Sequence, residues 1–311
     1  FYARGGKVLL IDQVFKQQDW SSELRQCYDQ CPGLKIVFTG SSVMRLKEEN
    51  PELGGIVKSY NLRGFSFREY LNLLTGKNFA KHTLDDILER HVDIANEFAQ
   101  QIDIQSHFTN YLHHGFYPFF REHRNFEENL LKTMNMMTEV DILLIKQIEL
   151  KYLTKIKKLF YLLAVEGPKA PNISNLASNI ETSRATVMNY IKYLSDARLI
   201  NMIYHVGDDF PKKPSKVMMY NPNLMYAIYP IVANTQDAME TFFVNLVWKD
   251  HKVNQGNKDA YYIVDERLKF KIVDGTHSAR QRNAPDILYA VYNSTVGHDN
   301  YIPLWMFGLL Y

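Results

Sequence analysis

Two short apolar runs, each followed by polar residues, constrain the fold of this chain most. Four apolar residues, Val8–Ile11, lead directly into Asp12, and a second run over 34–39 leads into Gly40 and Ser41. Runs of this length fit strands that are buried on both faces of a parallel sheet. The carboxyl ends of such strands meet at one edge, where α/β proteins place their ligands. We therefore expect Asp12 and the residues after the second run to line a ligand site.

The surrounding residues, 1–80, alternate between strand and helix patterns, which is typical of a parallel sheet. Ser66 followed three residues later by Glu69 is a capping box that predicts a helix start. The first helix is expected to be capped by Ser21 or Ser22. The sequence predicts strands at 8–11, 34–39 and 56–62, and helices at 21–29, 44–49 and 66–74.

Residues 81–165 read as almost wholly helical. Apolar residues around Leu84, Ile87 and His91 follow the three-four spacing of an amphipathic helix. The segment 107–120 is aromatic and is interrupted by Gly115 and Pro118, so it is either a kinked helix or an ordered loop.

The pattern over 150–220 is more specific. A helix ends near residue 165, and Gly167 with Pro168 breaks it. A short helix at 173–179, a turn, and a longer helix at 183–196 follow. Two extended stretches, 199–206 and 217–220, are joined by a loop rich in glycine and proline. This order predicts a helix-turn-helix followed by a β-wing, that is, a winged helix.

The last part of the chain, 221–311, predicts a small α/β domain. Helices are expected at 222–229 and 237–248, and strands at 252–254, 261–264, 268–273 and 287–292.

Composition places the chain among ordinary globular proteins, with 46% hydrophobic and 23% charged residues. The net charge of +2 favours neither presence nor absence of a polyanionic partner. Two cysteines, Cys27 and Cys31, make neither a disulfide framework nor a zinc site. No apolar run approaches the ~20 residues of a membrane span. We therefore expect a cytoplasmic protein without a membrane partner.

The stretch 7–70 resembles a prokaryotic family of AAA-type (P-loop) ATPases that carry a C-terminal domain of unknown function. The winged helix and the closing IPLWMFGLLY at 302–311 also fit the second half of that family, whose last domain is similar to a degenerate restriction-type nuclease. The motifs that carry the resemblance are KVLLIDQV at 7–14, DWSSELRQCYD at 19–29, LKIVFTGSS at 34–42 and YNLRGFSFREYL at 60–71.

The resemblance implies an α/β protein of four parts. These are a truncated ATPase core with a partial P-loop-type parallel sheet, a helical lid, a winged helix, and a small nuclease-like α/β domain. The expected boundaries are 1–80, 81–150, 151–220 and 221–311.

The resemblance also assigns roles at the strand ends. Asp12 is expected to hold the magnesium ion that bridges the nucleotide phosphates. Gln13 stands where the family usually has a glutamate that activates water, and an amide cannot accept that proton. Thr39 and Ser41 are expected to be polar sensors of the γ-phosphate or the attacking water, with Ser42 beside the nucleotide. A helix-capping role for Ser41 or Ser42 is the alternative.

Two further departures from the family pattern, besides Gln13, argue for weak activity. The chain contains no Gly-x-x-x-x-Gly-Lys-Ser/Thr, and Gly54 and Gly55 stand where the family often has paired arginines. Arg45 lies nearby, and Arg63 and Arg68 are expected to form structural ion pairs. We therefore expect ATP and magnesium in the complete protein, neither binding well to this chain, and hydrolysis that is slow or lost.

The alternative function is a non-enzymatic module that binds DNA or a protein client. Phosphate contact needs outward basic and polar side chains, but Asp208 and Asp209 lie in the wing loop and oppose it. Any DNA binding is therefore expected to be weak, and a role in packing between domains stays open. The candidate contacts are Ser183, Arg184, Thr186, Asn189 and Lys192 on the second helix, and Lys212, Lys213 and Lys216 in the wing.

A metal-dependent nuclease site is not expected in the last domain. Tyr261 and Lys271 stand where such a site needs acidic residues, and Asp265 and Asp274 at strand ends are expected to form turns. His113 and its neighbour His114 show no metal-ligand spacing.

Overall fold

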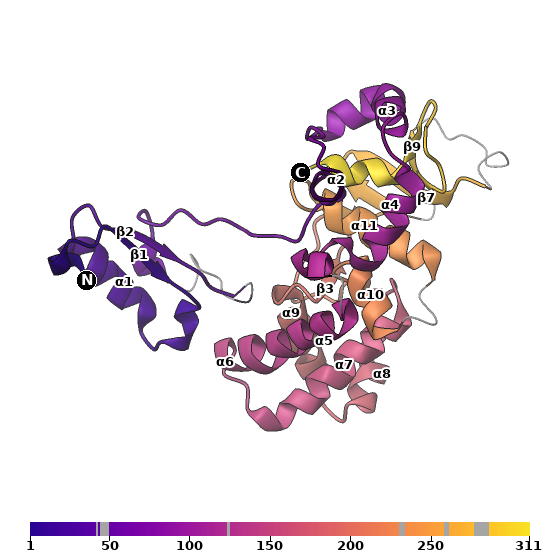
Figure 1. Cartoon of the computed structure of the whole chain (residues 1–311). Coiled ribbons are helices and arrows are strands. Elements are labelled where there is room, and N and C mark those ends of the chain that lie inside the picture. The colour runs from indigo at the N-terminus through magenta and orange to yellow at the C-terminus, as the bar shows by residue number, and fades with distance from the viewer. Residues whose placement is uncertain (42, 44–49, 123–124, 230–233, 258–260, 277–285) are drawn as a thin grey trace.

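The computed structural model describes residues 1–41, 43, 50–122, 125–229, 234–257, 261–276 and 286–311. Figure 1 shows a small N-terminal lobe, an extended connection and a larger body. We use the name N-terminal lobe for residues 1–41 and 50–57, and body for the described residues from 66 onwards; Val43 lies in a core of the body. No helix in the described residues is long and apolar enough to cross a membrane.

The N-terminal lobe is built on the two strands expected at its start. Strand β1 (Val8–Ile11) pairs in parallel with β2 (Lys35–Phe38), and α1 (Trp20–Gln30) connects them. A small core of Val14, Leu24 and Leu53 fills the space under the sheet. The parallel pairing confirms the prediction for these strands.

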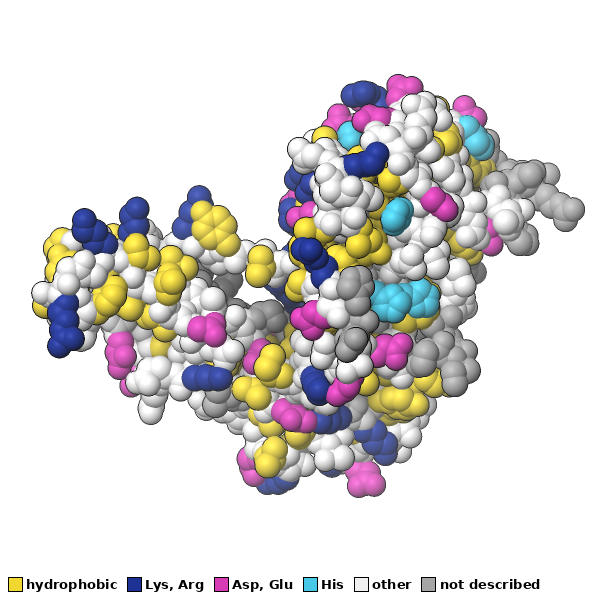
Figure 2. Space-filling model, viewed as in Figure 1, with side chains coloured by type: hydrophobic (Ala, Val, Ile, Leu, Met, Phe, Trp, Pro, Cys, Tyr) yellow, Lys and Arg dark blue, Asp and Glu magenta, His cyan; other side chains and the backbone are white. Residues whose placement is uncertain are grey.

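The expectation that both strands are buried on both faces is wrong for the described lobe. Along each strand exposed and partly buried residues alternate, and Leu10 on the outer face is 73% exposed. The cause is that helix α1 and the turn Pro51–Leu53 cover only one face of the pair. Figure 2 shows hydrophobic side chains on the surface of this lobe.

Two further expectations for the first 80 residues fail. The third strand expected at 56–62 does not form, because this stretch leaves the lobe and exposes 78% of Tyr60 and 92% of Leu62. Helix α1 is preceded by Asp19 as its N-cap residue, and Ser21 is instead buried and donates a hydrogen bond to Glu52. The helix expected at 44–49 lies outside the described residues.

The capping box at Ser66 is confirmed, and the segment 107–120 is a kinked helix. Ser66 begins α2, and α4 continues into a π-helical turn over Tyr111–Gly115 and a 3-10 turn over Pro118–Glu122. The helices of this region are α2 (Phe67–Thr75), α3 (Leu84–Ala99), α4 (Ile104–Asn110), α5 (Phe126–Met136), α6 (Leu143–Ile145) and α7 (Leu153–Glu166).

The order of elements predicted over 173–220 is present. Helices α8 (Ile173–Asn179) and α9 (Arg184–Asp196) are followed by β3 (Ile200–Ile203) and β4 (Lys216–Met219), which pair antiparallel. Ser183 caps α9 by accepting a hydrogen bond from the Thr186 amide.

A mixed five-stranded sheet ends the chain. Strands β5, β6 and β7 pair antiparallel, whereas β8 and β9 continue the sheet in parallel. The last strand and the 3-10 segment Leu304–Leu309 were not expected from the sequence. The elements are α10 (Pro222–Ile228), α11 (Thr235–Val247), β5 (Val253–Gln255), β6 (Tyr262–Val264), β7 (Leu268–Asp274), β8 (Ile287–Tyr292) and β9 (Tyr301–Pro303).

Two large cores hold the body together. One joins α2, α3 and α4 to α11, the mixed sheet and the closing residues 304–311, and the other joins α5 through α10 with β3 and β4. The carbonyl oxygen of Tyr311 accepts hydrogen bonds from Ser66 Oγ at 2.5 Å and Arg68 Nε at 2.9 Å. The start of α2 and the closing segment therefore depend on each other.

We expect Ser66→Ala to lower the free energy of unfolding by about 2 kcal/mol. The loss combines ~1 kcal/mol for the helix cap with ~1 kcal/mol for the buried bond to Tyr311. Denaturant titration monitored by circular dichroism measures it. The matched control is Thr83→Ala, which removes an exposed capping box on α3 and should cost only ~1 kcal/mol. Equal losses would show that the bond to Tyr311 contributes nothing.

Candidate functional site

Asp12 and Thr39 meet at the carboxyl edge of the parallel pair. The Thr39 hydroxyl donates a hydrogen bond to the Asp12 carboxylate and accepts one from the Gln13 amide at 2.9 Å. Backbone bonds continue the ladder past the strands, from the Thr39 amide to Ile11 and from Val14 to the Thr39 carbonyl. The structure therefore brings together three of the residues that the sequence placed at one site.

A sharp turn after β1 exposes this group. Gln13 has a φ of 53°, in the left-handed region that side chains with a Cβ seldom adopt. The turn sends the chain into the short 3-10 segment Val14–Lys16 and buries Val14 in the lobe core. Asp12 and Thr39 are both exposed, so a ligand in solution can reach them. An unusual backbone conformation beside polar groups is a frequent property of functional sites.

The residues at this edge fit a magnesium ion that arrives with phosphates. Magnesium keeps several waters and usually takes one or two carboxylates besides the substrate oxygens. The described residues hold no group of three or more His, Cys, Asp or Glu side chains that could form an all-protein metal site. Asp12, fixed by Thr39, is a suitable single carboxylate for such an ion.

Ser41 lies two residues further on and reaches the body. Its hydroxyl donates to Asp141 Oδ2 at 2.6 Å and accepts from the Val43 amide at 3.3 Å. Burial raises the pKa of the Asp141 carboxyl, while the bond from Ser41 and the charge of Lys16 act in the opposite direction. Ser42, the expected nucleotide neighbour, lies outside the described residues.

The residues at the expected arginine positions have a backbone that disfavours side chains. Gly55 has a φ of 77°, and a Cβ at Gly54 would lie 3.0 Å from the Pro51 carbonyl oxygen. An arginine at these positions would therefore be strained in this conformation. Arg45 lies outside the described residues.

Arg63 and Arg68 have structural contacts, but their closest partners are backbone oxygens and not the carboxylates of the expected ion pairs. Arg63 donates to the Asn245 carbonyl oxygen at 2.8 Å and lies over the rings of Tyr220 and Tyr311. Arg68 donates to the carbonyl oxygens of Tyr311 and Phe79, and its contact with Glu69 is longer, at 3.8 Å. Both arginines bind backbone oxygens more closely than carboxylates, which sequence spacing does not reveal.

Acidic neighbours engage two of the basic residues expected to contact DNA. Lys192 forms an ion pair with Asp196 on α9, and Lys212 forms one with Asp208 at 2.5 Å. Arg184 and Asn189 are exposed on α9, as is Lys213 in the loop before β4.

Lys216 is not a contact of the wing loop, contrary to the expectation. It begins β4, and its side chain is only 14% exposed. Its ammonium group lies 2.8 Å from Glu240 Oε2 and 3.1 Å from the Tyr262 hydroxyl. Tyr262 also donates to Glu240 at 2.6 Å. The three side chains form a buried polar cluster between β4, α11 and β6.

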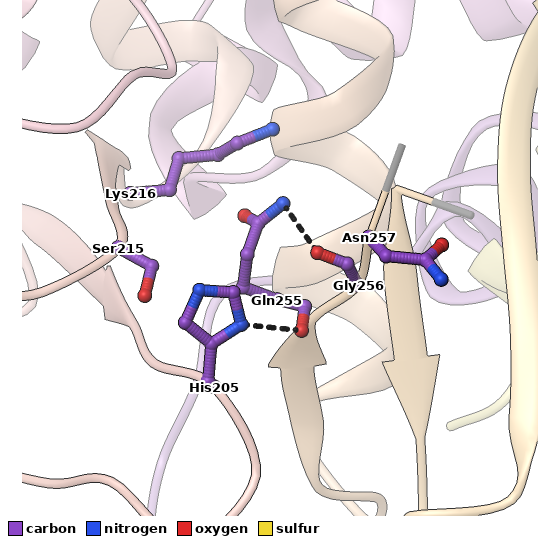
Figure 3. A pocket seen from close by; sticks show the side chains of 6 residues that line it. All are labelled: His205, Ser215, Lys216, Gln255, Gly256 and Asn257. Atoms are coloured by element: carbon purple, nitrogen blue, oxygen red, sulfur yellow. Dashed lines mark hydrogen bonds between the residues drawn. The ribbon is translucent and has the colours of Figure 1, made fainter. Parts of the chain in front are cut away.

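An open cleft of about 390 Å³ lies beside this cluster, and no sequence pattern predicted it. Figure 3 shows Gln255 at its centre, with His205 Nδ1 placed 3.3 Å from the Gln255 carbonyl oxygen. The charge of Lys216 is compensated by Glu240, so the cleft offers hydrogen-bonding groups rather than a strong field. The lining residues are His205, Ser215, Lys216, Gln255, Gly256 and Asn257.

The residues at the expected nuclease positions have structural contacts. The Lys271 ammonium lies 5.7 Å from the centre of the Tyr261 ring. Asp265 lies in the turn between β6 and β7 with a φ of 50° and accepts the Lys252 amide at 2.9 Å. Asp274 accepts the Thr276 amide at 2.9 Å. Both aspartates therefore form turns, as predicted.

We expect Glu240→Ala to lower the free energy of unfolding by about 3–5 kcal/mol, because it leaves the buried Lys216 ammonium without its partner. Denaturant titration measures the loss. Replacing both partners, Lys216→Met with Glu240→Leu, should cost less than the single change. Lys212→Ala, at an exposed pair, is the control and should cost under ~1 kcal/mol. A small loss for Glu240→Ala would contradict the buried pair.

Two family models match separate parts of the chain. Residues 1–71 match a family model described as an AAA domain, and residues 105–235 match a domain of unknown function (DUF8612). The chain is 28% identical over 218 residues to an uncharacterized protein of Methanocaldococcus jannaschii, MJ1637. That match covers 68% of this chain and 46% of the relative, so the chain spans about half the relative's length. No solved structure matches the chain. Residues 1–71 are therefore similar to an AAA domain.

Proposed function

We propose that the N-terminal lobe is part of an AAA-type module that binds ATP with magnesium and hydrolyses it slowly or not at all. The single observation that carries this proposal is the pairing of Asp12 with Thr39 at the exposed carboxyl edge of parallel strands. The match of residues 1–71 to an AAA domain supports it independently.

Asp12 would hold the magnesium ion, which neutralises charge on the bridged phosphates when it is bound. The Thr39 hydroxyl restricts the Asp12 side chain, because it donates to the carboxylate while it accepts from the Gln13 amide. This pre-orientation lowers the entropy that ion binding would cost. The chain has no Gly-x-x-x-x-Gly-Lys sequence, so the cradle for the phosphates would come from other residues.

Slow turnover follows from two features of this edge. The Gln13 amide can hydrogen-bond a water molecule but cannot take its proton. Gly54 and Gly55 supply no positive charge for the transferring phosphoryl group, and Gly55 favours glycine through its positive φ. The proposed module therefore holds nucleotide longer than an efficient ATPase would.

In the full-length protein, we expect Gln13→Glu to raise ATP turnover by up to ~10²–10⁴-fold, the contribution of a positioned general base. Steady-state release of inorganic phosphate at saturating magnesium measures this. Asp12→Ala should abolish magnesium-dependent binding of a non-hydrolysable ATP analogue in calorimetry.

Asp19→Ala is the matched control for Asp12→Ala, since Asp19 is exposed and its side chain makes no capping bond to α1. It should leave nucleotide binding unchanged. If the Asp12→Ala variant binds the analogue with magnesium as tightly as the parent does, this edge is not the magnesium site. Unchanged turnover in the Gln13→Glu variant would exclude the missing base as the cause of slow hydrolysis.

A second candidate is a binding module for nucleic acid or a protein client, built on residues 173–220. The order helix, helix and antiparallel pair favours a winged helix, and Arg184, Asn189 and Lys213 are exposed on it. With Lys192 and Lys212 paired to aspartates, the basic surface is small, which favours weak and mainly electrostatic binding.

The likeness of residues 221–311 to an inactive nuclease stays a prediction. The cytoplasmic location of the protein also stays a prediction.

We expect Arg184→Ala and Lys213→Ala each to weaken DNA binding and to reduce the slope of log affinity against log salt by about 1. Fluorescence anisotropy at several salt concentrations measures both effects. Lys192→Ala, whose charge is compensated by Asp196, is the control and should change little. Absence of binding at low salt would favour a packing role for this region and a protein client.

A further inference from the structure

The N-terminal lobe packs as a unit separate from the body. Its core of Val14, Leu24 and Leu53 belongs to neither of the two large cores. Figure 1 shows the lobe set apart from the body, with the extended connection between them. Contacts that fix the lobe on the body must therefore come from a few residues outside its core.

One of these contacts begins just after the candidate site. Ser41 donates its hydroxyl hydrogen to Asp141 in the π-helical turn Met137–Ile142. Val43 is fully buried in the second core of the body, together with Leu130 and Ile142. The chain thus passes within four residues from Thr39, at the ligand edge, to the interior of the body.

A second contact holds the connection where it reaches the body. Arg198, directly beyond α9, donates to the Leu62 carbonyl oxygen at 2.9 Å and to the Asn61 side chain. The chain is therefore held on the body by Ser41 and Val43 just after the ligand edge, and by Arg198 near the end of the extended connection. Only the first of these ties involves a residue of the candidate site.

A serine hydroxyl carries a single hydrogen, so it donates one hydrogen bond at a time. Ser41 gives that hydrogen to Asp141 in this structure. Contact with a bound γ-phosphate, the role that the resemblance to AAA-type ATPases implies for Ser41, would require the same hydrogen. The two uses exclude each other.

We propose that Ser41 is a switch: it latches the N-terminal lobe to the body through Asp141 and releases it when the hydroxyl turns to a bound nucleotide. The release half of this proposal rests on the proposed function, whereas the latch does not. The ligand shifts the population of docked lobes because it binds the released state better. Lobe position would thereby report nucleotide occupancy to the body that carries α8 and α9.

The latch is tested first on this chain without nucleotide. Spin labels at Gln18→Cys and Ser178→Cys, both exposed positions, report the distance between lobe and body in a background with Cys27→Ser and Cys31→Ser. Ser41→Ala and Asp141→Ala should each increase the undocked population roughly tenfold, the effect of losing one hydrogen bond to a charged group. Asp141→Asn keeps an acceptor oxygen and should fall between these variants and the parent.

Glu139→Ala is the matched control, because Glu139 lies in the same turn but pairs with Lys157 at the surface. It should leave the distance distribution unchanged. Distributions that are the same for the parent, Ser41→Ala and Asp141→Ala would overturn the latch.

The switch is then tested on the full-length protein with the same labels and a non-hydrolysable ATP analogue with magnesium. The analogue should increase the undocked population of the parent and leave that of the Ser41→Ala variant, which lacks the hydroxyl, unchanged. Binding of the analogue without a change in distance would overturn the switch and leave the proposed function intact. Absence of binding would overturn the proposed function and the release half, while the latch is judged on the nucleotide-free result.

Discussion

The body of this protein depends on the bond between its closing residues and the segment that leads into α2. Ser66 and Arg68 both donate to the Tyr311 carbonyl oxygen, and Arg63 lies over the Tyr311 ring. These contacts join residues 243 or more positions apart in the chain, and they bring α2, α3 and α4 into one core with α11 and the mixed sheet. The N-terminal lobe, in contrast, has a small core of its own.

This difference in burial gives the two parts different physical roles. The body holds some of its polar groups in buried contacts, of which Lys216 between Glu240 and Tyr262 is an example. The lobe keeps Asp12 and Thr39 in solvent, and it is held on the body by hydrogen bonds of Ser41 and Arg198 and by the buried Val43 side chain. Because these contacts are few, breaking them costs little free energy. This suits a part of the protein whose position changes when a ligand binds.

Local sequence signals were reliable where neighbouring residues alone determine the structure. The capping box of Ser66 and Glu69 and the order of elements over 173–220 formed as expected. The parallel strands of the lobe also formed, because helix α1 between them carries the chain back to the same end of the sheet. The failures involve tertiary partners. The apolar residues of 56–62 resemble a strand but find no neighbouring strand, whereas Tyr301–Pro303 becomes a strand because β8 lies beside it. Pairing between distant segments leaves little trace in local pattern.

The sequence by itself determined which residues stand at the ends of β1 and β2, since the polar residues that follow each apolar run mark where the strand ends. It also determined the chemical limit at Gln13, because an amide cannot take a proton in any fold. Only the tertiary structure decided which side chains those residues meet. In the folded chain the Ser41 hydroxyl donates to Asp141, and Lys216 is buried beside Glu240. The physical reason is that a hydrogen bond needs its partners within about 3 Å, and only folding sets that distance between residues far apart in sequence.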